Sequence, residues 1–207
     1  MNKMESVQEQ LKEIKKRFFL MMNGVTSRSM RDKGLEYKIN WGVEVPKLKA
    51  MASEYGKNYD LAVALWKEDI RECKILAVMM MPPEKMEADL MQLWIEQLPS
   101  QEIAELSAFY LFQHVRDVSE HAFVWIASGI AVRQICGYCV LARRFMRGEE
   151  PNERDINELV DQSLAVLQGD EVSVKHSAMT CLQRLAELGA AHEKIVDSAL
   201  NGLRRSR

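Results

Sequence analysis

The chain has 207 residues, a length that suits one domain or two small lobes sharing one core. Hydrophobic residues make up 47% and charged residues 28%, a globular balance that excludes a disordered or collagen-like chain. The 28 Lys and Arg residues against 30 Asp and Glu residues give a net charge of -2, which excludes a uniformly basic nucleic-acid-binding protein but allows a local basic face. Only 5 Pro and 10 Gly interrupt the chain, so we expect an all-α fold.

No apolar run approaches the roughly 20 residues that span a bilayer, and residues 1–19 lack the apolar segment of a signal peptide. We therefore expect no membrane association and a cytoplasmic location. The four cysteines are too few for a disulfide framework in a chain of this length, which fits a reducing compartment. Residues 1–50 carry a net charge of +5 and residues 51–132 a net charge of -7, so the middle of the chain is acidic.

Apolar spacing, caps and breakers predict a succession of helices with short linkers. The first helix begins at the capping box of Ser6, and Asn23 ends it, followed by a loop to Tyr37. Pro46 opens the next helix and Gly56 closes it. The further predicted helices span residues 58–67, 69–81, 84–98, 100–115, 119–128, 130–147, 152–168, 171–188 and 191–204.

Three of these helices share a pattern near their starts. Each places a β-branched residue before a cation, at Arg71, Arg133 and Lys175. The interval of 42 residues from Arg133 to Lys175 fits one helix pair of the HEAT/armadillo type, whereas the 62 residues from Arg71 to Arg133 are too long for one pair and too short for two full pairs. We therefore expect an α-solenoid of stacked antiparallel HEAT-like helix pairs, a single domain over residues 1–207 with a concave surface.

A more specific pattern covers residues 37–81. It holds Tyr37, the Gly42-Val43 step, a helix led by Pro46, the pair Leu65-Trp66 and the pair Arg71-Glu72. In these residues, and in its organisation over residues 5–205, the chain resembles the bacterial DNA alkylation repair family, the HEAT-like-repeat alkylpurine DNA glycosylases (AlkD type).

The resemblance implies a concave face that holds duplex DNA independently of its sequence. It also implies hydrolysis of the N-glycosidic bond of cationic N3- or N7-alkylated purines, without a metal or other cofactor. The positive charge of such a base already makes it a good leaving group. The protein then supplies a carboxylate and aromatic walls that attract the cationic nucleotide.

The chain departs from the family pattern at the residues that carry this chemistry. The family's Trp-Asp-x-x-Asp pattern should fall within residues 102–108, where the second Asp position is Ser107 in one register and Ala108 in the other. The Trp that the family places on the penultimate helix aligns with residues 179–181, Met-Thr-Cys. Of the expected site, only the basic residue keeps a counterpart, as Arg133.

Five residues are the candidates for a DNA site. Arg133, Lys175, Arg143 and Arg144 are expected to contact DNA phosphates, which would supply sequence-independent affinity. The alternatives are ion pairs between helices, or, for Arg143 and Arg144, a favourable position at the end of a helix dipole. Glu105 is the candidate replacement for the missing catalytic carboxylate, the alternative being a solvated helix face.

Cys136 and Cys139 form a CxxC motif that suggests thiol redox chemistry. The motif lies in the middle of a predicted helix, within an apolar run, rather than at the helix N-terminus that lowers the pKa of a reactive thiol. A zinc site needs two further ligands, and the remaining His and Cys residues are scattered. We therefore expect both side chains to pack between helices and expect no metal site.

Trp66, Trp94 and Trp125 lie at helical spacing among apolar residues and are expected in the core, whereas Trp41 is expected to be partly exposed. Residues 78–81, Val-Met-Met-Met, are expected to fill the core. The basic cluster of Lys12, Lys15, Lys16 and Arg17 indicates a solvated face, or contacts to phosphates.

The sequence thus leads to a DNA alkylation repair-type protein that binds duplex DNA in a concave groove. The alternative is a non-catalytic HEAT-like scaffold that binds DNA or a protein partner, which the acidic middle and the missing Trp and Asp favour. Lesion preference, protein partners and oligomeric state are not set by the sequence.

Overall fold

The computed structural model describes residues 3–205, which form twelve α-helices and two short 3-10 helices. Within these residues no β-strand occurs, and Ile39 and Ile70 form one isolated parallel bridge. The internal contacts divide the chain into two compact units, Met1–Leu93 and Trp94–Arg207. The predicted all-α fold is confirmed, whereas a single domain over residues 1–207 stays a prediction.

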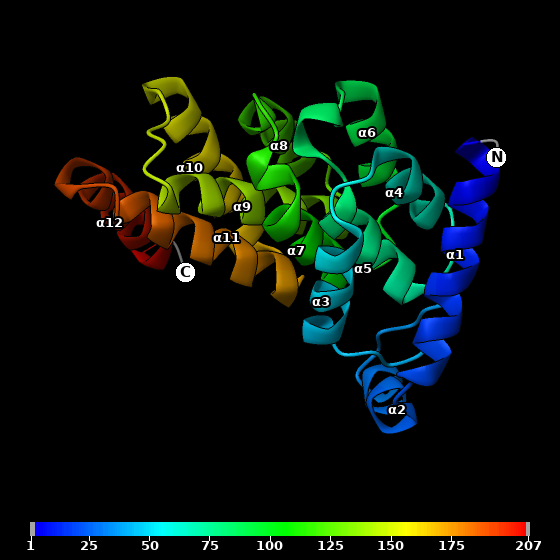
Figure 1. The fold of residues 1–207 in the computed structure, drawn as a ribbon. Helices are drawn as coiled ribbons and strands as arrows, with labels where there is room; N and C mark the ends of the chain where they lie inside the picture. Colours follow the sequence, from blue (N-terminus) through cyan, green and yellow to red (C-terminus); the bar gives the residue numbers. More distant parts are fainter. Residues whose placement is uncertain (1–2, 206–207) are drawn as a thin grey trace. The chain divides into compact units, whose positions relative to one another are not determined.

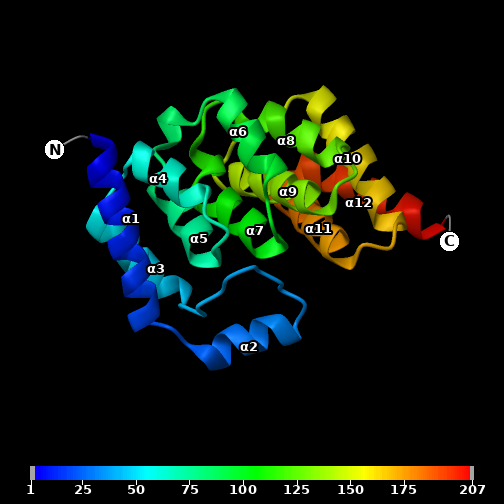
Figure 2. The same cartoon turned by 90° about the vertical axis from the view of Figure 1, so that its right-hand side faces the viewer.

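The N-terminal unit is built around one helix whose residues are all buried. Figures 1 and 2 show the course of the helices of this unit. Its elements are α1 (Lys3–Leu20), α2 (Gly24–Asp32), α3 (Val45–Tyr55), α4 (Tyr59–Trp66), α5 (Arg71–Met80) and the 3-10 turn η1 (Pro83–Lys85). All residues of α5 are buried, and α3 and α4 pack against it. The N–H of Asn58, before α4, donates to the carbonyl of Met80, the last residue of α5, at 2.9 Å, so α4 and α5 are antiparallel.

The C-terminal unit is built around α9, which packs against α7, α8 and α11. Helix α6 (Ala88–Glu96) crosses the boundary between the units. The further elements are α7 (Gln101–Tyr110), η2 (Phe112–His114), α8 (Val118–Ala127), α9 (Ala131–Met146), α10 (Glu153–Gln168), α11 (Val172–Ala186) and α12 (Ala190–Arg205). Ser119 at the start of α8 donates to Glu149, just after α9, at 2.9 Å, so these two helices are antiparallel.

The signals that predicted helix ends act as expected in most places. Pro46 lies in the first turn of α3, and Gly56 ends that helix with a φ of 69°. Four helices begin with a side chain that accepts a hydrogen bond from the backbone N–H three residues further on, and these caps are Asn23, Asn58, Ser100 and Asn152.

Four predictions of secondary structure were wrong. Helix α1 begins at Lys3, before the predicted capping box at Ser6, and the helix predicted over residues 100–115 ends as α7 at Tyr110, before the turn η2. The segment from Asn23 to Tyr37 is not only a loop, because the Asn23 side chain accepts from Thr26 N at 3.1 Å and starts helix α2. The helix predicted over residues 84–98 is shortened to α6 by the turn η1. At Asn23 a residue that ends one helix also caps the next.

The predicted repeat needs one correction. Arg71, Arg133 and Lys175 do lie in the first turns of α5, α9 and α11. The interval from Arg71 to Arg133 nevertheless holds two helix pairs, because α6, α7 and α8 have only 9, 10 and 10 residues. Short helices, rather than a missing helix, therefore explain the interval of 62 residues.

The core contains the residues that apolar spacing assigned to it. Trp66, Trp94 and Trp125 are buried, and so are residues 78–81, as predicted. Trp41 is partly exposed, also as predicted. Wide aromatic rings and flexible Met side chains thus fill the spaces between short helices.

A buried ion pair fastens residues 39–43 to the start of α5. Arg71 and Glu72 are at most 1% exposed, and their side chains lie 3.2 Å apart. Arg71 donates to the carbonyl of Val43 at 2.9 Å, and the Glu72 carboxylate accepts from the backbone N–H groups of Val43 and Trp41 at 3.2 and 3.3 Å. Breaking such a pair would leave an uncompensated buried charge, so the Gly42-Val43 step and the Arg71-Glu72 pair form one structural unit.

The basic cluster on α1 is partly used inside the unit. Lys15 pairs with Glu68 at 2.9 Å, and Arg17 pairs with Glu54 at 2.7 Å. Lys12 and Lys16 are exposed. The prediction of a solvated face therefore holds for only part of the cluster.

The crowding at Gly42 gives a test of this arrangement. Gly42 and Gly34 both have a positive φ, of 70° and 80°, but an added Cβ at Gly42 would lie 2.2 Å from the carbonyl oxygen of Asn23, whereas one at Gly34 would meet nothing within 4 Å. We expect Gly34→Ala to lower the free energy of unfolding by about 1 kcal/mol, and Gly42→Ala by about 3 kcal/mol, because steric overlap adds to the left-handed backbone cost. Urea denaturation of the two variants measures the difference, and equal losses would contradict the close approach of the two segments.

Candidate functional site

Three helices of the C-terminal unit lie side by side, with α9 between α7 and α11 (Figure 1). The guanidinium of Arg143 on α9 lies 4.5 Å from the ring centre of Phe109 on α7. One turn earlier on each helix, the charge of Glu105 acts on the thiol of Cys139. Because the same four-residue step separates both pairs, α7 and α9 run in the same direction.

Helix α11 completes this surface through Ser177, whose side chain lies close enough to Cys139 to lower the pKa of that thiol. We call the surface around Glu105, Phe109, Cys139, Arg143 and Ser177 the α9 face. Glu105 and Phe109 are exposed, and Cys139 and Arg143 are partly exposed. The α9 face thus combines a carboxylate, an aromatic ring, a thiol and a cation within two helical turns.

Charge is segregated between neighbouring helices of this unit. Within their bounds, α9 carries Arg133, Arg143 and Arg144, α11 carries Lys175 and Arg184, and neither helix has an acidic residue. Helix α10, which packs against α11, carries one cation among four carboxylates, and its charged residues are Glu153, Arg154, Asp155, Glu158 and Asp161. Within these bounds the charge of α9 and α11 is positive, although Arg144 and Arg184 pair with Glu149 and Glu187, which lie just beyond the ends of the two helices.

Two of the predicted DNA-contacting residues, Arg133 and Arg143, are not neutralised by an ion pair within the described residues. Arg133 is partly exposed, and within residues 3–205 its side chain has no hydrogen bond or ion pair. Arg143 lies over the Phe109 ring, a contact that leaves its N–H groups free to donate to an anion. Both residues belong to α9.

The other two predicted cations, Arg144 and Lys175, have different surroundings. Arg144 forms an ion pair with Glu149 and donates to the carbonyl of Gln113 at 3.2 Å, so it braces η2 against the end of α9. Lys175 lines a pocket of about 540 Å³ together with residues of α10 and α12, among them Asp197. The pair with Glu149 makes Arg144 less available to a phosphate than Arg143, whereas Lys175 stays a candidate for phosphate contact.

The carboxylate predicted at Glu105 is exposed and accepts a hydrogen bond from Gln101 at 2.8 Å. The positions of the expected second Asp, Ser107 and Ala108, are both fully buried. A carboxylate at either position would point into the core, so in both registers Glu105 is the acidic residue of this helical turn that faces outward. Phe109, one turn further on, was missed by the sequence analysis, although its four-residue spacing from Glu105 placed it on the same stripe.

The aligned position of the penultimate-helix Trp lies on α11. Cys181 is buried in the core, and Met179 lines the pocket with Lys175. These residues supply no aromatic wall, so Phe109 is the exposed ring of the α9 face.

The cysteines behave as packed side chains. Cys136 is fully buried, and burial raises its pKa well above the ordinary value. Burial and then the Glu105 charge raise the pKa of Cys139 to about 11, while the Ser177 side chain and Arg143 act in the opposite direction. All four cysteines are free, and the raised pKa values disfavour the thiolate that redox chemistry requires.

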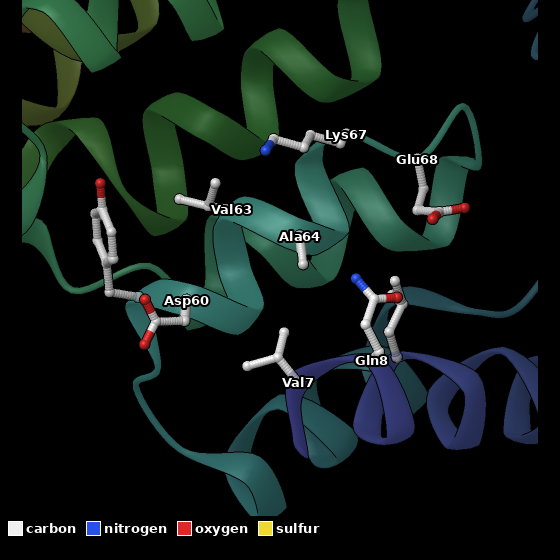
Figure 3. A pocket seen from close by; sticks show the side chains of 9 residues that line it. Val7, Gln8, Asp60, Val63, Ala64, Lys67 and Glu68 are labelled. Atoms are coloured by element: carbon white, nitrogen blue, oxygen red, sulfur yellow. The ribbon is translucent and has the colours of Figure 1, made fainter. Parts of the chain in front are cut away.

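A separate pocket of about 370 Å³ lies in the N-terminal unit between α1 and α4 (Figure 3). Val7 and Gln8 of α1 face Ala64 of α4 across it, and Asp60 and Lys67 lie at its edges. Its apolar middle holds no cluster of chemically active groups.

The described part of the chain has no group of three or more His, Cys, Asp or Glu side chains arranged to hold a metal ion. Among its helices, none combines the length and apolar character needed to cross a bilayer. A cytoplasmic location stays a prediction.

Comparison with known proteins gives two matches. The family model described as "DNA alkylation repair enzyme" matches residues 14–202. A solved structure titled "A new family of proteins related to the HEAT-like repeat DNA glycosylases with affinity for branched DNA structures" is similar with a TM-score of 0.80 and 15% sequence identity, over 93% of this chain and 82% of that chain. This likeness confirms the predicted HEAT-like helical fold. No curated protein matches the chain.

The neighbourhood of Cys139 gives a test of the α9 face. With a pKa of about 11, the thiol should react with iodoacetamide at pH 8 roughly 100-fold more slowly than an ordinary cysteine. Glu105→Gln removes a charge that raises this pKa, so alkylation should become about threefold faster, whereas Arg143→Gln should slow it. Mass spectrometry of Cys139 labelling between pH 7 and pH 10 measures both changes, and unchanged rates in both variants would contradict the shared face.

Proposed function

The chain belongs to the DNA alkylation repair enzyme family, and on this premise we propose that it binds duplex DNA through the α9 face and Arg133. The observation that carries the proposal is the charge pattern of the C-terminal unit. Helices α9 and α11 carry five cations and no carboxylate, beside the acidic helix α10, and of the five Arg133, Arg143 and Lys175 form no ion pair within the described residues. DNA phosphates attract such a surface independently of base sequence, and counterion release supplies much of the binding free energy.

Arg133 and Arg143 are the residues best suited to contact phosphates. Neither is engaged in an ion pair within the described residues, whereas Arg144 pairs with Glu149. An unpaired arginine gives up no internal bond when it binds a phosphate, and its planar fork donates two parallel hydrogen bonds. The solved relative whose title states an affinity for branched DNA structures supports DNA as the partner.

A second candidate function is hydrolysis of the N-glycosidic bond of a cationic alkylpurine. The observation that favours it is the position of Glu105, one turn before the exposed ring of Phe109. In this reaction the bond between the purine nitrogen and C1′ breaks, and its electron pair neutralises the base. Water adds to C1′, Glu105 accepts a proton from it, and the products are a free alkylated base and an abasic site.

The absence of a carboxylate at Ser107 and Ala108 favours binding without chemistry. The non-catalytic form of the proposal is a HEAT-like module that binds DNA. A positive surface also suits an acidic protein partner, and the binding experiment separates the two.

The binding proposal predicts a charge-specific loss of affinity. The double variant Arg133→Gln with Arg143→Gln should weaken binding to a linear duplex roughly tenfold at low salt and lower the slope of log K against log salt by about 0.9 for each phosphate that is no longer neutralised. Arg154→Gln on α10 is the matched control, because it removes an exposed arginine outside the α9 face. Fluorescence anisotropy over a salt series measures both quantities. Equal losses in variant and control would contradict the proposed surface, and no binding by the wild type at low salt would direct the search to a protein partner.

The catalytic candidate predicts single-turnover release of 7-methylguanine and 3-methyladenine from methylated duplex DNA. Loss of a general base lowers a rate by about 100-fold or more, so Glu105→Gln should abolish release while DNA binding is kept. The exposed carboxylate of Glu158 on α10 serves for the control Glu158→Gln. Release that survives Glu105→Gln would exclude Glu105 as the base, and no release at saturating protein would leave a DNA-binding module.

A further inference from the structure

The junction of α1 and α2 exposes several large apolar side chains. Four of them fall within seven residues, and their exposed fractions are 56% for Phe19, 82% for Leu20, 54% for Met22 and 81% for Val25. Helix α2 itself has no buried residue, and Figure 2 shows it at the edge of the N-terminal unit. We call these four side chains the apolar corner. A cluster of this kind on a chain of ordinary composition marks an interaction site.

The exposure of the apolar corner is imposed by the backbone beneath it. The N–H of Asn23 donates to the carbonyl of Trp41 at 2.9 Å, and the Ser27 hydroxyl donates to the carbonyl of Asn40 at 3.1 Å. Gly42 lets these segments approach closely, since a Cβ there would overlap the Asn23 carbonyl oxygen. The start of α2 is therefore held by polar contacts, which leaves its apolar side chains directed to solvent.

The Phe19 ring of the apolar corner is held in one orientation by its neighbour. Phe19 packs edge-to-face against Trp41, with the ring centres 5.9 Å apart. Because Trp41 lies in the segment fastened by Arg71 and Glu72, the Phe19 ring rests on a rigid support. A side chain held in place loses less conformational entropy when it inserts into a partner.

The residues around the apolar corner carry a positive net charge, although Arg17 and Lys38 pair with Glu54 and Asp69. Residues 16–38 contain six Lys or Arg residues and two Asp or Glu residues, in a chain whose net charge is -2. Arg28 and Arg31 on α2 and Lys33 at its end are all exposed. Apolar side chains ringed by exposed cations are complementary to a stack of bases flanked by phosphates.

We propose that the apolar corner is a wedge that binds DNA where base stacking is interrupted, at a branch point, nick or gap. Leu20 and Val25 contact the exposed face of the terminal base pair, while Arg28 and Arg31 contact the flanking phosphates. An interrupted stack has already lost the interaction that a wedge must break in a continuous duplex, so it is the preferred site. This inference rests on the proposed DNA binding and adds to it a preference for interrupted stacks.

The test compares a four-way junction with a linear duplex of the same arm sequence, by fluorescence anisotropy. The double variant Leu20→Ser with Val25→Ser replaces two side chains that are more than four-fifths exposed, so the fold should be unaffected. We expect the wild type to prefer the junction, and the variant to lose roughly tenfold in junction affinity with less than a twofold change on the duplex. The control is Val124→Ser, which removes an exposed valine from α8.

A second readout uses 2-aminopurine in the terminal base pair at the branch point, whose fluorescence should change when the wild type contacts that base pair and stay constant with the double variant. Equal affinity of the wild type for junction and duplex, or an unchanged preference in the double variant, would overturn the wedge while leaving DNA binding intact. Sedimentation with phosphatidylserine vesicles that the double variant alone abolishes, with its junction preference kept, would overturn it in favour of a membrane surface. If the wild type bound neither the junction nor the duplex, the proposed DNA-binding function itself would be wrong.

Discussion

The close packing of α9 against α7, α8 and α11 determines which residues of the C-terminal unit reach solvent. Gly137 makes this packing possible, since a Cβ there would lie 2.7 Å from the carbonyl oxygen of Ala122 on α8. Helices α7, α8 and α11 cover most of α9, so few of its side chains reach solvent. Arg143 and Cys139 are among the side chains of α9 that stay partly exposed, and the neighbouring helix α7 adds Glu105 and Phe109. The composition of the candidate site therefore follows from the packing of α9 against its neighbouring helices.

A different constraint shapes the N-terminal unit. There a buried ion pair and a crowded glycine fasten a loop, and the loop in turn holds a short helix that buries none of its own side chains. In the C-terminal unit apolar packing selects the residues that face solvent, whereas in the N-terminal unit backbone hydrogen bonds keep apolar residues exposed. Each unit therefore has its own candidate binding surface. The surface of the C-terminal unit is cationic and polar, and that of the N-terminal unit is cationic and apolar.

Much of the fold was predictable from the sequence because its signals are local. Pro46, Gly56 and Asn58 mark helix ends through their own backbone preferences, and the Trp and Met residues follow the helical period of a buried face. Helix α2 was missed because Asn23 is read equally well as the end of one helix or the cap of the next. Its apolar residues make no core contact, so periodicity gave no signal.

The site was predictable only in part. The positions of Glu105, Arg133 and Arg143 on their helices follow from spacing, and all three reach solvent. The neutralisation of Arg144 by Glu149, and the place of Lys175 in a pocket formed with residues of α10 and α12, depend on neighbours that spacing along one helix does not predict. The Arg71-Glu72 pair, which carried the family resemblance, proved to be structural because both residues are buried.

The most direct test of the central claim is photo-cross-linking to DNA from the α9 face. A photoreactive phenylalanine analogue is placed at Phe109, which is exposed beside Arg143, and in a second protein at Phe123 of α8 as the control. Our account predicts a covalent adduct with duplex DNA from position 109 and none from position 123. Adducts of equal yield from both positions, or from position 123 alone, would contradict DNA binding at the α9 face.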